Sequence, residues 1–184
     1  IYGDNTDGAG LLRDITHNLG WKIHGKRVLL LGAGGAVRGV IAPLLAEQPS
    51  RIVIANRTLE KAEALVKDFS VGKSAQEIKL LRASSLHIHA RPFDIVINGT
   101  SASLQGAMPD LDPAILNPNA CCYDMMYGAQ LTLFLQWAQR HGAKEVVDGL
   151  GMLVEQAAES FYLWRGVRPE TKAVMEQLRE GSLA

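Results

Sequence analysis

A glycine-rich turn between an apolar run and a helix is the feature that most constrains the fold of this chain. Residues 27–31, with the apolar run Val-Leu-Leu-Leu after Arg27, predict a strand that is buried on both faces. Gly32-Ala33-Gly34-Gly35-Ala36 follows, and residues 36–46 predict a helix that Pro43 should bend or interrupt. Such a turn predicts a dinucleotide site, because glycines let the backbone approach a pyrophosphate and the helix directs its N–H groups at it.

The third glycine of the usual G-x-G-x-x-G pattern is replaced by Val37, which predicts a slightly wider contact between helix and strand. The alternative interpretation is a glycine turn without a ligand, but the strand–turn–helix setting favours the dinucleotide. A P-loop is excluded, because no Gly-Lys-Ser/Thr follows the turn.

Strands and helices alternate along most of the chain, which predicts an α/β fold with a parallel sheet and helices on both faces. Asp7 and Thr58 precede helical segments as possible N-caps, and Gly20 follows the first of these helices. Further strands are expected at 51–55, 78–81 (an edge strand), 93–98, 119–125 and 145–147. Further helices are expected at 8–19, 59–69, 131–141, 151–164 and 169–179.

The end of the second predicted strand indicates which dinucleotide is bound. An NAD site usually has Asp or Glu there, for the ribose 2′-hydroxyl, whereas this chain has Asn56-Arg57-Thr58. Arg57 offers a planar fork for a 2′-phosphate, and Lys61 adds a charge one helical turn later. The alternative is a solvated arginine. Because positive charge is unfavourable near a helix N-terminus, a compensating phosphate is favoured and we expect NADP(H).

Composition excludes several other classes of protein. Nineteen basic residues balance nineteen acidic ones, so no strong field attracts nucleic acid or an anionic membrane. No signal peptide or membrane-length apolar run is visible, and we expect a cytoplasmic protein. Cys121 and Cys122 are neighbours that should point to opposite faces of a strand without bridging. No set of thiols or carboxylates accompanies the five histidines, so we expect no metal site.

Several motifs, in a fixed order and covering nearly the whole chain, resemble those of the shikimate dehydrogenase family. They are Gly3-Asp4-Asn5-Thr6-Asp7-Gly8, the glycine turn, Asn56-Arg57-Thr58, Asn98-Gly99-Thr100-Ser101, Tyr123-Asp124-Met125-Met126-Tyr127 and the run from Asp148 to Gln156. The resemblance implies a Rossmann-like doubly wound parallel sheet with helices on both faces. It also implies an oxidoreductase that reversibly reduces 3-dehydroshikimate to shikimate with NADPH, in chorismate and aromatic amino-acid biosynthesis.

The resemblance further implies how the chain divides. The family has an N-terminal substrate domain and an NADP domain, with the active site in the cleft between them. Residues 1–20 are expected to form a helical connection that carries the end of the substrate domain, and residues 21–150 the NADP-binding domain. Residues 151–184 are expected to form helices that pack back toward the substrate cleft. Because the chain starts at Ile1 almost on a motif, we expect a piece of a longer protein.

The resemblance also assigns roles to single residues. Asp7 would be the catalytic carboxylate that pairs with a lysine, and Asp7, Tyr127 and Gln156 would contact the substrate. Met125 and Gly149 would lie near the nicotinamide. From the residues alone, Asp7 is an N-cap, Tyr127 a partly buried aromatic and Gln156 a surface residue. The expected cofactor-binding residues are Gly32, Ala33, Gly34, Gly35, Ala36, Asn56, Arg57, Thr58, Lys61, Thr100, Met125, Gly149 and Met152.

Departures from the family pattern leave alternatives open. The family's Ser-x-Ser element and its lysine in an Asn-Val-Thr-x-Pro-x-Lys stretch are absent, so we assign no catalytic lysine and expect the chain alone to be inactive. Gly99 stands where the family often has Ala, and Leu133 where Pro is usual after Thr132. The alternatives are a quinate/shikimate-type relative and a stand-alone NADP-binding module without catalysis. Expected partners are shikimate or 3-dehydroshikimate, with no nucleic acid or membrane, in a monomer or homodimer.

Overall fold

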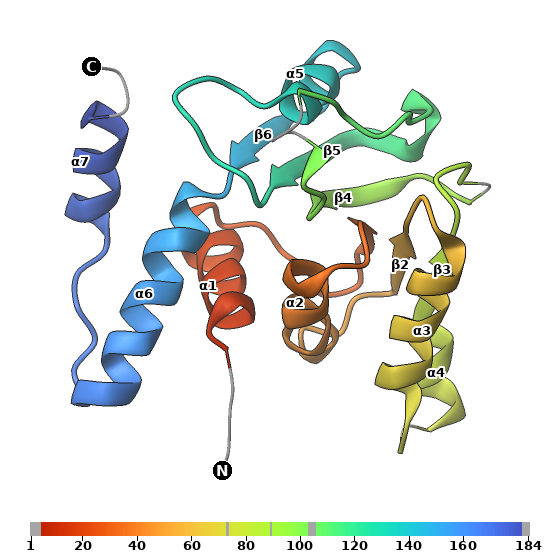
Figure 1. Ribbon diagram of the computed structural model, residues 1–184, viewed down its shortest axis with the longest axis horizontal. Coiled ribbons are helices and arrows are strands. Elements are labelled where there is room, and N and C mark those ends of the chain that lie inside the picture. The colour runs from red at the N-terminus through yellow and green to blue at the C-terminus, as the bar shows by residue number, and fades with distance from the viewer. Residues whose placement is uncertain (1–4, 73, 89, 103–105, 182–184) are drawn as a thin grey trace.

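The computed structural model describes residues 5–72, 74–88, 90–102 and 106–181. Within them a six-stranded parallel sheet has the order β3-β2-β1-β4-β5-β6 (Figure 1). This order is that of the doubly wound dinucleotide-binding fold and confirms the predicted fold class. The strands are β1 (Arg27–Leu31), β2 (Arg51–Ala55), β3 (Leu81–Ser84), β4 (Phe93–Asn98), β5 (Leu116–Asp124) and β6 (Glu145–Asp148).

Helices cover both faces of the sheet. One face packs against α1, α2, α3 and α6, and the opposite face packs against α5, which Figure 1 shows on the other side of the strands from α1 and α2. The helices are α1 (Asp7–Arg13), α2 (Gly35–Ala46), α3 (Leu59–Ser70), α4 (Ala75–Leu80), α5 (Leu133–Arg140), α6 (Leu150–Arg165) and α7 (Lys172–Gly181), and α1 continues as a π-helical turn (Asp14–Asn18). None of the helices in this part of the chain has the length and apolarity that a membrane crossing requires.

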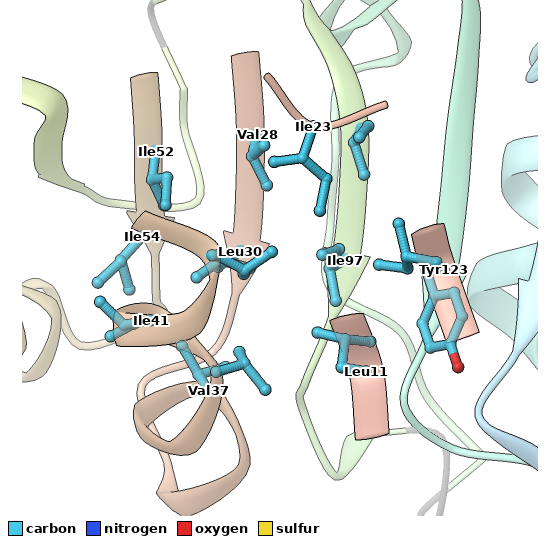
Figure 2. Packing of buried hydrophobic residues seen from close by; sticks show 14 of the residues in the cluster. Leu11, Ile23, Val28, Leu30, Val37, Ile41, Ile52, Ile54, Ile97 and Tyr123 are labelled. Atoms are coloured by element: carbon cyan, nitrogen blue, oxygen red, sulfur yellow. The ribbon is translucent and has the colours of Figure 1, made fainter. Parts of the chain in front are cut away.

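Alternate side chains of β1 enter two separate cores. Val28 and Leu30 lie in the core that also contains Ile41 of α2 (Figure 2), while Leu29 and Leu31 lie in the core that contains side chains of α5. All four are fully buried, so the prediction of a strand buried on both faces is confirmed. On β5, Cys121 packs against the first core and Cys122 lies in the second, and both thiols are free. Burial raises the pKa of the Cys122 thiol to about 12, as expected of a buried apolar residue.

The local predictions at three helices have mixed outcomes. Asp7 is the first residue of α1 and not its N-cap, which is Thr6. The prediction of Thr58 as the N-cap residue of α3 is confirmed, although its side chain makes no capping hydrogen bond. Pro43 does not interrupt α2, which runs from Gly35 to Ala46. The packing there is close, since a Cβ on Gly8 of α1 would lie 2.4 Å from Pro43 Cγ.

The predicted edge strand at residues 78–81 is displaced. Residues 78–80 end the helix α4, and the edge strand β3 begins at Leu81, which is 2% exposed. Leu81 pairs with Ile52 of β2, so the strand is positioned by its pairing with β2. A short apolar run suits either a helix or a strand, and the pattern alone does not distinguish them. The last helix also differs, beginning at Lys172 and not at residue 169.

Candidate functional site

The glycine turn lies at the carboxyl end of β1, between β2 and β4, where the strand order reverses. In doubly wound sheets this crevice is the usual ligand site. Gly32 has φ +104°, and a Cβ there would lie 3.2 Å from the Gly99 carbonyl oxygen. The Gly32 N–H donates to Ala55 O at 2.8 Å, which holds the turn against β2. Both the backbone angle and the close approach therefore require glycine at this position.

The rest of the turn is open to a ligand. Gly34 and Gly35 are exposed, and a Cβ on either would meet no atom within 4 Å. Gly34 caps α2 without a side-chain hydrogen bond, and the first turn of α2 has no acidic residue. Ala33 packs against the core, whereas Ala36 is exposed beside the open space. The backbone donors and space that a pyrophosphate needs are thus present.

A pocket of about 330 Å³ opens at the carboxyl ends of β4, β5 and β6. It brings together predicted residues from both ends of the chain. Those that line it are Asp7, Ala36, Thr100, Met125, Tyr127, Gly149, Met152 and Gln156. Gly99, Ser101, Met126 and Leu153 also line it and were not predicted as site residues.

A close crossing of α1 and α6 brings Asp7 to Gln156. A Cβ on Gly10 of α1 would lie 2.7 Å from the backbone nitrogen of Gln156 and 2.8 Å from the carbonyl oxygen of Met152. The two helices lie side by side in Figure 1, although they come from opposite ends of the sequence. The absence of a side chain at residue 10 therefore lets the start of α1, with Asp7, form one wall of the pocket.

A buried carboxylate organises the loops after β4 and β5. Asp124 accepts hydrogen bonds from Asn98 Nδ2 at 3.1 Å, Met126 N at 3.0 Å and Thr132 Oγ1 at 2.5 Å. Asn98 Oδ1 in turn accepts from the N–H and the hydroxyl of Thr100, at 3.1 and 2.8 Å. Burial raises the pKa of Asp124. Neither Asn98 nor Asp124 was predicted as a site residue, although each is a polar residue at the end of a largely apolar strand, which was an available signal.

A second buried cluster joins the turn after α1 to β5 and to the start of α6. The Tyr123 hydroxyl donates to Asp14 Oδ2 at 2.7 Å and accepts from Met152 N at 3.3 Å. Asp14 also accepts from Asn18 Nδ2 at 2.9 Å. Burial raises the pKa of both Asp14 and Tyr123. Asp14 packs so close to Gly151 that a Cβ there would lie 2.1 Å from its Oδ1, so this cluster holds the start of α6 in place.

The predicted adenosine-end residues lie outside the pocket, where β2 passes into α3. Asn56 Nδ2 donates to Thr58 O at 2.8 Å and shapes this turn. Arg57, Thr58 and Lys61 are exposed. Glu60 is the acidic residue in the first turn of α3, one residue before Lys61. Two cationic side chains are therefore available to an anionic ligand here.

Two further points concern the predicted sites. In the described part of the chain, no group of three or more His, Cys, Asp or Glu residues could hold a metal ion. Gly3 and Asp4 of the first family motif lie outside the described residues, as do residues 182–184.

Comparison with known proteins gives consistent matches. The family model "Shikimate / quinate 5-dehydrogenase" matches residues 14–106, half of the chain, and "Shikimate 5'-dehydrogenase C-terminal domain" matches residues 149–179. A shikimate dehydrogenase (NADP(+)) of Cellvibrio japonicus is 60% identical over 179 residues, which are 97% of this chain and 63% of that protein.

Two solved structures have the same fold. An Ael1 enzyme from Pseudomonas putida has a TM-score of 0.86 and 50% identity, over 95% of this chain and 62% of that one. A shikimate 5-dehydrogenase from Thermus thermophilus in complex with NADP(H) and shikimate has a TM-score of 0.77 and 31% identity, over 98% and 64%. The chain therefore spans less than two thirds of the length of these relatives. It belongs to the shikimate/quinate 5-dehydrogenase family.

Proposed function

We propose that this chain is the NADP(H)-binding part of an NADP-dependent shikimate dehydrogenase, which reversibly reduces 3-dehydroshikimate to shikimate. The observation that carries the proposal is the pocket shared by Asp7, Tyr127 and Gln156 with Thr100, Met125, Gly149 and Met152. The names of the relatives and the ligands of the Thermus thermophilus structure support the same activity. Family membership supports a shikimate-like hydroxy acid as the substrate class.

The proposed cofactor site extends from the adenosine end to the pocket. Arg57 and Lys61, with Asn56 and Thr58, would hold the 2′-phosphate. The glycine turn, Gly32, Ala33, Gly34, Gly35 and Ala36, would hold the pyrophosphate through its open backbone. Thr100, Met125, Gly149 and Met152 would contact the nicotinamide end. When bound, NADPH would supply the hydride for the substrate ketone.

The pocket residues of the chain would bind and orient the substrate. Tyr127 and Gln156 offer a hydroxyl and an amide that can hydrogen-bond the hydroxyl groups of shikimate. Asp7, which lines the same pocket, would hold the ammonium of a lysine that the resemblance assigns to the substrate domain. That ammonium would donate the proton to the alkoxide oxygen, so Asp7 supplies half of the acid–base pair.

We also propose the division of the chain expected from its sequence, with residues 1–20 as the connection, 21–150 as the NADP-binding domain and 151–184 as returning helices. Exposed apolar side chains at the end of α6 support it, since Trp164 is 81% exposed and Leu163 65%. Large apolar side chains gathered at one place commonly mark an interaction surface. They would pack against the substrate domain. Monomer or homodimer formation and a cytoplasmic location stay predictions.

Nucleotide titration of the isolated chain tests the proposal. NADPH should bind at least tenfold more tightly than NADH, because only NADPH carries a 2′-phosphate. Equal affinities for NADPH and NADH would contradict the NADP assignment. Failure of the chain to bind either nucleotide would refute the proposal. With shikimate and NADP⁺ the chain should show no turnover. Turnover would refute the need for a lysine from outside the chain.

The matched family description favours quinate as a second candidate substrate, since it covers shikimate and quinate dehydrogenases together. The full-length protein, assayed with shikimate and with quinate, distinguishes the two by the ratio of kcat/KM values. A ratio that favours quinate would replace shikimate as the proposed substrate and leave the cofactor assignment unchanged.

A further inference from the structure

Val37 and Gly99 meet where the glycine turn adjoins the loop after β4. A Cβ on Gly99 would lie 2.6 Å from Val37 Cγ2, closer than real Cβ contacts allow. Its other nearest neighbours would be Met125 Sδ at 3.2 Å, on a flexible side chain, and Leu31 O at 3.5 Å, an ordinary contact. Val37 is therefore the neighbour that leaves residue 99 no room for a side chain.

Val37 has little freedom to move away. It is fully buried in the first turn of α2, in the core cluster that also contains Leu30 and Ile97 (Figure 2). A β-branched side chain in a helix has one strongly preferred χ1 rotamer, so rotation gives no escape. A methyl group at residue 99 would instead have to move apart α2 and the loop after β4.

Both segments line the candidate cofactor crevice, since Ala36 of α2 and Gly99 and Thr100 of the loop line the same pocket. The first turn of α2 follows the open backbone of Gly34 and Gly35, and the loop after β4 carries Gly99 and Thr100 into the pocket. The Gly99 N–H donates to Leu31 O at 2.9 Å, so the loop is also attached to β1. A change in spacing at residues 37 and 99 would therefore change the width of the crevice.

We propose that Val37 and Gly99 are a coupled pair of positioning residues that sets the distance between the glycine turn and the loop after β4. The pair aligns the pyrophosphate and nicotinamide portions of the dinucleotide, and the bulk of Val37 demands glycine at residue 99. The identity of the ligand rests on the proposed function. The steric coupling between the two residues does not.

A double-mutant cycle tests the coupling, with the unmodified chain, Gly99→Ala, Val37→Ala and the double variant. Dissociation constants for NADPH and for 2′,5′-ADP, which lacks the nicotinamide, are measured by calorimetry well below the unfolding temperature. Gly99→Ala should weaken NADPH binding about tenfold and lower the Tm by roughly 2–12 °C, the range for an overpacked core. Binding of 2′,5′-ADP should change less than about twofold, since it keeps the 2′-phosphate contacts at Arg57 and lacks the nicotinamide half that the loop after β4 would align.

In the Val37→Ala background the same change at residue 99 should have little effect on NADPH binding or Tm, because the blocking methyl is gone. Gly128→Ala is the matched control: a Cβ there would have only Gln130 O, 3.7 Å away, as a neighbour, so Tm and NADPH binding should be unchanged.

Three results would overturn the inference. The first is that Gly99→Ala lowers the Tm and weakens NADPH binding as much in the Val37→Ala background as in the unmodified chain. The second is that it weakens the binding of 2′,5′-ADP as much as that of NADPH. The third is that it changes neither the Tm nor NADPH binding in the unmodified chain. If Gly99→Ala does not fold, restored folding in the double variant supports the coupling and continued misfolding refutes it. If the unmodified chain binds no NADPH, the proposed function fails, whereas the Tm cycle still decides the steric coupling.

Discussion

The Tyr123 hydroxyl makes two buried contacts, and the effect of its removal can be worked out from them. In Tyr123→Phe, Asp14 would lose its 2.7 Å donor, and the Met152 N–H would lose its acceptor at 3.3 Å. A hydrogen bond to a charged group contributes about 1.5–3 kcal/mol, and an unsatisfied buried N–H costs about 1–3 kcal/mol. Because the second contact is long, we expect the free energy of unfolding to fall by about 3 kcal/mol at neutral pH.

The loss should also depend on pH. Burial raises the pKa of Asp14 in the folded state above 3.8, and Glu155 and Asp148 raise it further, whereas the hydrogen bond from Tyr123 lowers it. The contribution of Asp14 to stability is therefore greatest below pH 3.8 and declines as the pH rises through the folded pKa. Without the hydroxyl the folded pKa rises further, so Tyr123→Phe should cost more at pH 7 than at about pH 4.5.

Urea denaturation of the unmodified chain and of Tyr123→Phe at both pH values measures this difference. Asp14→Asn provides the matched background, because an amide does not titrate. There the cost of Tyr123→Phe should be the same at both pH values. An equal cost at both pH values with Asp14 present, or a cost below about 1 kcal/mol, would show that the hydroxyl does not stabilise a buried carboxylate.

Three other substitutions test the candidate site. Arg57→Ala should weaken NADPH binding by about 1.5–3 kcal/mol and leave NADH unchanged in calorimetry, and the same loss in Lys67→Ala would contradict a specific contact. Gly10→Ala should lower the free energy of unfolding by about 1–3 kcal/mol or more in urea, since its Cβ would overlap the backbone of Gln156; an unchanged midpoint would refute the tight crossing. Asp124→Asn should destabilise the chain by about 2 kcal/mol and weaken NADPH binding, because an amide cannot accept all three hydrogen bonds that the carboxylate accepts. Unchanged NADPH binding would show that these hydrogen bonds do not position the pocket residues.

Segments with continuous apolar runs were predicted with their correct bounds. The strands β1, β2 and β4 begin and end where the sequence indicates, because glycine or polar residues adjoin each buried run. The errors occur where local sequence allows several outcomes. Residues 78–80 suit a helix or a strand, and pairing with β2 decides that the strand starts at Leu81. Thr58 holds the predicted N-cap position, but a capping hydrogen bond also needs a side-chain orientation that the sequence does not specify.

By itself, the sequence determined the parallel α/β fold, the glycine turn and the cationic turn at Arg57, because each depends on residues that are neighbours in the chain. Only the tertiary structure decided which distant residues share the pocket and what supports it. Tyr123 and Asp14 are 109 positions apart, and Asn98 and Asp124 are 26 apart. The room that Gly99 leaves for Val37 likewise exists only once α2 packs against β4. Such contacts depend on how whole elements pack, which local residue patterns do not encode.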